Sequence, residues 1–156
     1  MMLRPFVLAV LLPLLLGTSC RLAVSFFVAN LSPRPIHVEY SVPCRPACPS
    51  PTVVAVQTLK HVRALGAIHG ARPAAAGVRG RVDSLVTYSL DLPPDTAVWI
   101  FEGAAPFSGK VRDFEDQFPN VRVAVDTGQS ARLYEGRALA DSFHMWHKLV
   151  HVLEVR

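Results

Sequence analysis

The distribution of proline is the sequence feature that most restricts how this chain can fold. Eleven of the 13 prolines follow residue 19, and they are often paired or close together. Proline fixes φ and has no backbone N–H, so it interrupts helices and interior strands but is tolerated in turns. This distribution disfavours long helices and favours short strands joined by turns.

Several segments between the prolines have strand-like content. Residues 36–42 alternate apolar and polar side chains, which predicts a strand with one buried and one solvated face. Residues 22–29 also read as a strand, and the turn-forming residues 30–35 predict that the two strands form a hairpin with a longer loop. Further strands are predicted at 52–58, 82–92, 97–101, 121–125, 131–134 and 149–155. Seven or eight short strands indicate an all-β fold, a small β-sandwich that is immunoglobulin-like or similar.

Other segments are less regular. Residues 59–68 carry apolar side chains at every third position, which fits a helix, but they follow a β-branched start, so helix and strand both stay open. Helix and strand also stay open for residues 137–148. Residues 66–81 are rich in Gly, Ala and Arg and are predicted to be a flexible connection.

The first 19 residues have the order of a secretory signal. Arg4 is followed by an uncharged, mostly apolar run at 6–16 and by small residues at 17–19. The apolar run is shorter than the roughly 20 residues that a membrane-spanning helix needs. We therefore expect residues 1–19 to be removed and residues 20–156 to form a single domain.

The end of this leader, Thr18-Ser19-Cys20, resembles the lipobox of bacterial lipoproteins. In that family a leucine and two small residues precede the cysteine that receives the lipid, and Gly17 stands here in the place of the leucine. The resemblance implies that Cys20 is lipidated and that the chain is anchored in the bacterial cell envelope, facing the periplasm. The alternative is ordinary cleavage after Ser19 and secretion, because Gly17 and Ser19 also satisfy the small-x-small rule.

Cys44 and Cys48 are the two cysteines left if Cys20 carries a lipid. Nearby cysteines of exported proteins most often form a disulfide, which predicts a bond between Cys44 and Cys48. Followed by Pro49, they also resemble the CxxxCP arrangement of copper-delivery proteins of oxidase assembly. That resemblance implies a metal site shared with a distant histidine.

His144, His147 and His151 are the candidates for such histidines. On a helix, their spacing would put all three on one face, within reach of one metal ion. On a strand, His144 would point opposite to the other two. The valines at 150, 152 and 155 favour a strand, so we expect surface histidines without a joint site.

Asp126-Thr127-Gly128, preceded by three small or apolar residues, resembles the catalytic signature of aspartic proteases. Those enzymes need a long β lobe after the motif, whereas only 28 residues follow it here. Asp and Gly are also the preferred residues of tight hairpin turns. We therefore predict a turn and not a protease site.

The formal net charge of +4 is spread along the chain without a basic stripe, so we do not expect a nucleic-acid partner. The chain has no Gly-rich phosphate loop, G-x-S-x-G elbow, H-E-x-x-H motif or acidic calcium loop. We expect a non-catalytic envelope lipoprotein without a cofactor, with a binding or structural role towards another envelope protein. The alternatives are a periplasmic copper-type metal-handling protein and an enzyme of unrecognised type. The enzyme would need scattered Asp, His and Ser residues to converge, which sequence order does not show.

Overall fold

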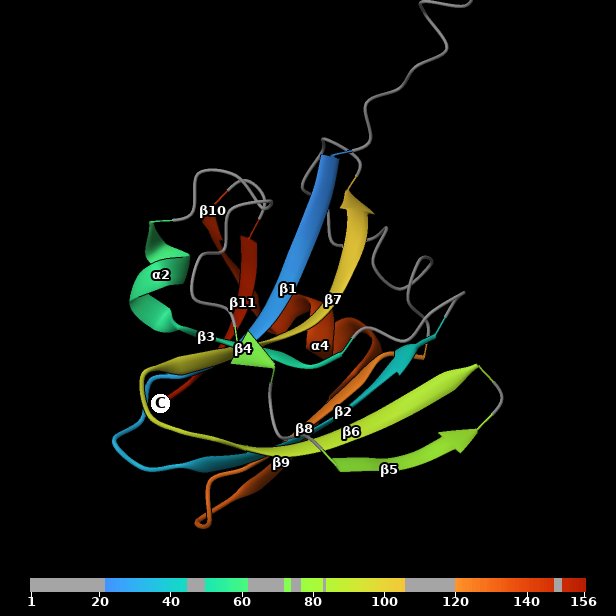
Figure 1. Cartoon of the computed structure of the whole chain (residues 1–156), viewed down its shortest axis with the longest axis horizontal. Helices are drawn as coiled ribbons and strands as arrows, with labels where there is room; N and C mark the ends of the chain where they lie inside the picture. Colours follow the sequence, from blue (N-terminus) through green and yellow to red (C-terminus); the bar gives the residue numbers. More distant parts are fainter. Residues whose placement is uncertain are drawn as a thin grey trace, which may run out of the picture.

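Two β-sheets pack face to face in the computed structural model, which describes residues 22–44, 50–61, 72–73, 77–82, 84–105, 120–147 and 150–156 (Figure 1). Sheet A has the order β10 (Phe143–His147), β11 (Val150–Val155), β1 (Leu22–Asn30), β7 (Thr96–Ala105), β3 (Thr52–Ala55) and β4 (Arg72–Pro73). Sheet B has the order β5 (Gly77–Val82), β6 (Leu85–Leu92), β2 (Ile36–Pro43), β8 (Arg122–Asp126) and β9 (Ala131–Glu135). Neighbouring strands are antiparallel except β1 and β11, which are parallel. The predicted all-β sandwich is confirmed.

Sheet B is amphipathic. Side chains of β2 are alternately buried and partly exposed along its whole length, as the 36–42 pattern predicts. Tyr40 lies opposite Tyr88 of β6, and their ring centroids are 5.3 Å apart on the buried face. The other face carries polar side chains of β2 and β6, together with Ala124 of β8 and the exposed Leu133 of β9.

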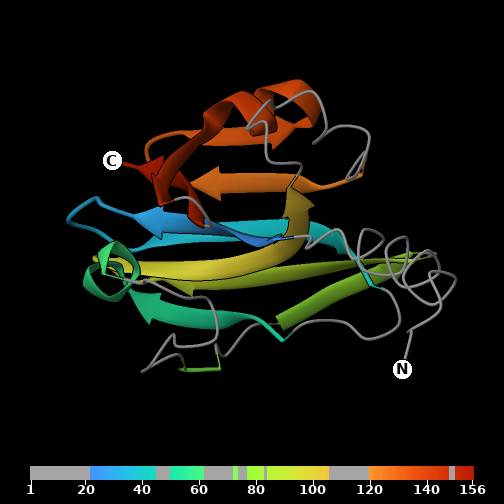
Figure 2. The same cartoon turned by 90° about the horizontal axis from the view of Figure 1, so that it is seen from above.

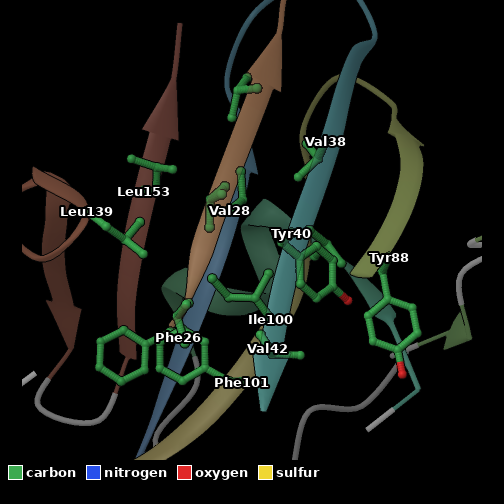
Figure 3. Packing of buried hydrophobic residues seen from close by; sticks show 14 of the residues in the cluster. Phe26, Val28, Val38, Tyr40, Val42, Tyr88, Ile100, Phe101, Leu139 and Leu153 are labelled. Atoms are coloured by element: carbon green, nitrogen blue, oxygen red, sulfur yellow. The ribbon is translucent and has the colours of Figure 1, made fainter. Parts of the chain in front are cut away.

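Sheet A is covered on both faces, which explains why the 22–29 segment does not alternate. Phe26 points into the core between the sheets, where its ring stacks on Phe101 at 4.5 Å between centroids. Phe27 packs on the opposite, outer face with Val56 and Leu59 of the short helix α2 (Val56–Lys60). Figure 3 shows the core between the sheets, with Val38, Tyr40, Val42 and Tyr88 of sheet B and Phe26, Val28, Ile100, Phe101 and Leu153 of sheet A.

A second short helix, α4 (Gly136–Ser142), connects the edge strand β9 of sheet B to the edge strand β10 of sheet A. Figure 2 shows it beside β8 and β9, at one side of the sandwich. Its Leu139 side chain is fully buried in the core between the sheets. The helix therefore closes this side of the core.

The predicted hairpin between residues 22–29 and 36–42 is wrong, because β1 belongs to sheet A and β2 to sheet B. Both sides of β1 are already occupied by β7 and β11, so the chain must cross to the other sheet. Asn30 holds this crossing: its buried Nδ2 donates to Arg34 O at 2.8 Å and to Leu92 O at 2.9 Å. Its Oδ1 accepts hydrogen bonds from the backbone N–H and the hydroxyl of Ser32.

Other expectations need smaller corrections. The predicted strand at 52–58 ends at Ala55, because α2 follows and its apolar side chains cover the outer face of sheet A. The region 66–81, which was predicted to be a flexible connection, contains β4 and most of β5. Each of these short strands lies at the edge of a sheet and pairs with a single neighbouring strand. Residues 62–70 lie outside the described residues. The described residues form eleven strands, against the seven or eight predicted; β4 and β5 were not predicted, and β10 falls in the region 137–148 where helix and strand stayed open.

We predict that Leu139→Ala lowers the free energy of unfolding by about 2–5 kcal/mol, because it opens a cavity where α4 closes the core. Leu133→Ala is the matched control: Leu133 is 59% exposed on β9, whereas Leu139 is 0% exposed. We expect this control to change the free energy by less than about 0.5 kcal/mol. Urea unfolding followed by circular dichroism measures both changes. Equal losses for the two leucines would contradict the proposed role of α4.

Candidate functional site

The outer face of sheet B carries a set of polar side chains from two neighbouring strands, which we call the polar face. Its residues are His37, Glu39 and Ser41 of β2 and Thr87, Ser89 and Asp91 of β6. The register places His37 opposite Asp91, Glu39 opposite Ser89, and Ser41 opposite Thr87. Residues opposite each other in a sheet point to the same side, so these six side chains share one face.

Three of these side chains form a continuous hydrogen-bonded chain. Ser89 Oγ lies 2.9 Å from His37 Nε2, and His37 Nδ1 lies 2.7 Å from Asp91 Oδ1. With the imidazole proton on Nδ1, the ring donates to the carboxylate and accepts from the serine hydroxyl. This is the order of groups in a Ser–His–Asp catalytic triad, which is recognised by geometry and not by sequence position.

The sheet itself positions the three residues. Ser89 and Asp91 are two residues apart on β6, so their side chains leave the same face one after the other. His37 lies directly opposite Asp91 and diagonal to Ser89, within reach of a long planar side chain. The imidazole of His37 therefore contacts both Ser89 and Asp91, which are consecutive side chains on the same face of β6.

The surroundings of Ser89 are open on one side and acidic on the other. Gly77 of β5 lies opposite Ser89, and a Cβ at Gly77 would come no closer than 3.8 Å to the Ser89 carbonyl oxygen. Gly77 thus presents no side chain that could cover the hydroxyl. Glu39 lies opposite Ser89 on β2. The His37 and Asp91 side chains are 39% and 81% exposed, so a molecule in solution can reach the site.

A second polar pair on this face has hydroxyls but no base. Ser41 Oγ and Thr87 Oγ1 are 2.8 Å apart, and either can donate. Ser41 and Thr87 lie on the same two strands as His37 and Ser89, and their side chains point to the same solvent-facing side. Ser41 is therefore a matched control for Ser89, because its hydroxyl is hydrogen-bonded on the same face but not to an imidazole.

Ser89, His37 and Asp91 belong to no sequence motif that predicts a role for them. The alternation in 36–42 does place His37 on the solvated face, and Ser89 and Asp91 have the spacing of one strand face. The missing information was the pairing of β2 with β6, since residues 22–29 were the expected partner of β2. The sequence shows no catalytic constellation, which is why a non-catalytic protein is expected from it. The fold nevertheless brings a hydroxyl and a carboxylate within hydrogen-bond distance of the same imidazole.

The cysteines expected to pair are only partly described. Cys44 is buried in the core between the sheets, its backbone N–H donates to Ser84 O at 2.7 Å, and it is in the disulfide-bonded form. Cys20 and Cys48, which could each be its partner, lie outside the described residues. The pairing of Cys44 with Cys48 therefore stays a prediction.

The three C-terminal histidines lie on two different strands. His144 and His147 are exposed on β10, whereas His151 is half-buried on β11. His144 lies opposite Val152, which packs on the outer face of sheet A, while the His151 ring stacks on Phe26 at 5.2 Å in the inner core. His144 and His151 therefore lie on opposite faces of the sheet, and a shared metal site would need them on one face.

The described residues contain no group of three or more His, Cys, Asp or Glu side chains that could hold a metal ion. Asp126, Thr127 and Gly128 form the predicted hairpin turn between β8 and β9. Asp126 Oδ1 accepts a hydrogen bond from the Gly128 N–H at 2.7 Å, and Gly128 has a φ of 76°, which favours glycine. Neither described helix has the length and apolar character that a membrane crossing requires.

We predict that His151 makes stability depend on pH just below 6.5. Burial lowers the pKa of His151 from its usual 6.5, so the unfolded chain takes up this proton at a higher pH than the folded chain. The free energy of unfolding therefore falls as the pH drops from above 6.5 towards the folded pKa. His151→Phe, which keeps a ring beside Phe26, should reduce the fall in Tm between pH 8 and pH 5.5.

His147→Gln is the control for this measurement, because His147 is exposed on the neighbouring strand. It should leave the pH dependence of the wild-type protein intact. If His151→Phe loses as much Tm as the wild type over this range, burial of His151 does not set the dependence.

Comparisons with protein families, curated proteins and solved structures find no match to this chain. A function for this chain is therefore inferred from its own sequence and structure.

Proposed function

We propose that this chain is a bacterial cell-envelope lipoprotein, exported by residues 1–19 and anchored through a lipid on Cys20. The observation that carries the proposal is the order of charge, apolar run and small residues that ends at Cys20. The domain would face the periplasm.

The anchor would leave the domain very little freedom. Arg21 is the single residue between Cys20 and Leu22, and two residue steps of extended chain span at most about 7 Å. The end of the sandwich at which β1 begins would then lie against the membrane surface. The opposite end, with the turns at 31–35 and 127–130, would point into the periplasm.

A binding role is supported by the sheet edges. Among the described residues, the exposed large hydrophobic side chains are Val78, Leu133 and Met145, and each lies on an edge strand, β5, β9 and β10 respectively. Edge strands present unpaired backbone N–H and C=O groups, and partners can add an extended segment to them. We propose that the partner is another envelope protein that pairs with one of these edges, and that neither a nucleic acid nor a cofactor is required.

Metal handling by Cys44, Cys48 and the C-terminal histidines has less support. Cys44 is in the disulfide-bonded form, which leaves its sulfur without a thiolate for a metal. The described histidines of this set do not converge either, since His144 and His151 lie on opposite faces of sheet A. We therefore place the binding role first.

We predict that the mature protein begins at Cys20 and carries a diacylglyceryl group there. Mass spectrometry of the N-terminal peptide from the membrane fraction is the measurement. Cys20→Ser should release the domain from the membrane, because Gly17 and Ser19 still allow ordinary cleavage. A different mature N-terminus, or an unmodified Cys20 in the wild-type protein, would exclude the lipoprotein proposal.

We predict that Cys44 and Cys48 are joined to each other. A turn across the three intervening residues can bring two Cα atoms within the roughly 4.4–6.8 Å that a disulfide needs. Thiol counting on the denatured, non-reduced protein should find neither thiol free. Because the closed loop is short, Cys48→Ser should lower the free energy of unfolding by only about 1–2 kcal/mol. Two free thiols beyond Cys20 would refute the bond and favour the metal alternative.

A further inference from the structure

We propose that Ser89 is a nucleophile that hydrolyses short-chain carboxylic esters, with His37 as general base and Asp91 as the group that orients the imidazole. The activity would be added to the anchoring and binding roles proposed above and does not depend on either. It uses only Ser89, His37 and Asp91 of the polar face.

The carboxylate of Asp91 determines which nitrogen of the His37 imidazole carries the proton. Asp91 lies 2.7 Å from His37 Nδ1, so the carboxylate favours the tautomer with its proton on Nδ1. Nε2 then has a free lone pair directed at Ser89 Oγ, 2.9 Å away. A base within about 2.6–3.2 Å of a hydroxyl is in position to accept its proton.

The chemistry then follows the serine-esterase scheme. Ser89 Oγ attacks the carbonyl carbon of the ester while its proton moves to His37 Nε2. The bond to the leaving alcohol breaks, and the alcohol receives that proton. A water molecule next attacks the acyl-serine, gives one proton to His37 and releases the carboxylic acid as the proton returns to Ser89. One ester and one water thus give one acid and one alcohol, with no redox change.

The surroundings of Ser89 indicate the class of ester. Apart from His37 and Asp91, the residues next to Ser89 are Glu39 and Thr87 of the polar face and Gly77 of β5, none of which offers an apolar wall for a long acyl chain. Gly77 leaves the approach from β5 free, and the exposed Asp91 and His37 side chains leave the approach from solvent free. The site therefore fits a short acyl group, such as acetyl, carried by either a small or a large molecule.

The expected rate is modest for a physical reason. Ser89 lies within a paired strand, where backbone N–H groups are engaged in the sheet ladder and are not directed at a developing oxyanion. Loss of an oxyanion donor typically lowers the rate by about 10²–10³-fold. General-base assistance by His37 remains and typically contributes about 10²–10⁴-fold.

The test uses the full purified protein with two probes. A fluorophosphonate should label Ser89, located by peptide mapping, and p-nitrophenyl acetate should be hydrolysed faster than p-nitrophenyl octanoate. Ser89→Ala should lower the rate with p-nitrophenyl acetate at least about 10-fold, within the usual range for general-base catalysis. Asp91→Asn should also lower it, because an amide does not fix the imidazole proton on Nδ1.

Ser41→Ala is the matched control, since Ser41 is hydrogen-bonded to Thr87 on the same face without an imidazole. It should keep both the labelling and the wild-type rate. The labelling arm uses the wild-type protein and so stays informative if a variant fails to fold. Labelling at another residue or at none, or equal rates for the wild type and Ser89→Ala, would overturn the proposal. A Cys20 without lipid would leave it untouched and affect only the lipoprotein proposal.

Discussion

Burial of β1 on both faces is the constraint on which the sandwich depends. Phe26 fills the core between the sheets and Phe27 fills the outer face of sheet A, so neither face of this strand can be left to water. The outer face needs α2 as a cover, and the strand needs both β7 and β11 as partners. Since β1 and β11 lie far apart in the sequence, the centre of sheet A is completed only when distant segments of the chain meet. Pairing over such a sequence separation makes folding slow compared with local contacts.

Asn30 links β1 of sheet A to β6 of sheet B through hydrogen bonds. It is fully buried at the end of β1, and its amide makes four hydrogen bonds, to Arg34, Leu92 and twice to Ser32. A buried amide that is satisfied in this way is compatible with only one arrangement of the backbone groups around it. Through Leu92, Asn30 fixes the end of β6 beside the end of β1. The strand that carries Ser89 and Asp91 is therefore held in place from sheet A.

The sequence predicts the parts of the fold that depend on local patterns. Alternation in 36–42 predicts β2 and its solvated face, and Asp126 and Gly128 predict the turn between β8 and β9. The pairing of strands depends on long-range burial, which no local pattern reports, so the partner of β2 was assigned wrongly. The edge strand β5 was missed because its glycines and arginines resemble a linker. The candidate site was missed for the same reason as the pairing, since Ser89 and His37 meet only through the β2–β6 register.

The core of the sandwich and its candidate site are set by the same register. Tyr40 and Tyr88 pack against each other on the buried face, directly beside the pair of Glu39 and Ser89 on the solvated face. A slip of β2 by one residue would turn its tyrosine to water and its histidine into the core, because side chains alternate with a period of two. The free energy of burying the two aromatic rings therefore also keeps the imidazole within hydrogen-bond distance of the serine. The sheet register therefore fixes the backbone positions from which Ser89, His37 and Asp91 project.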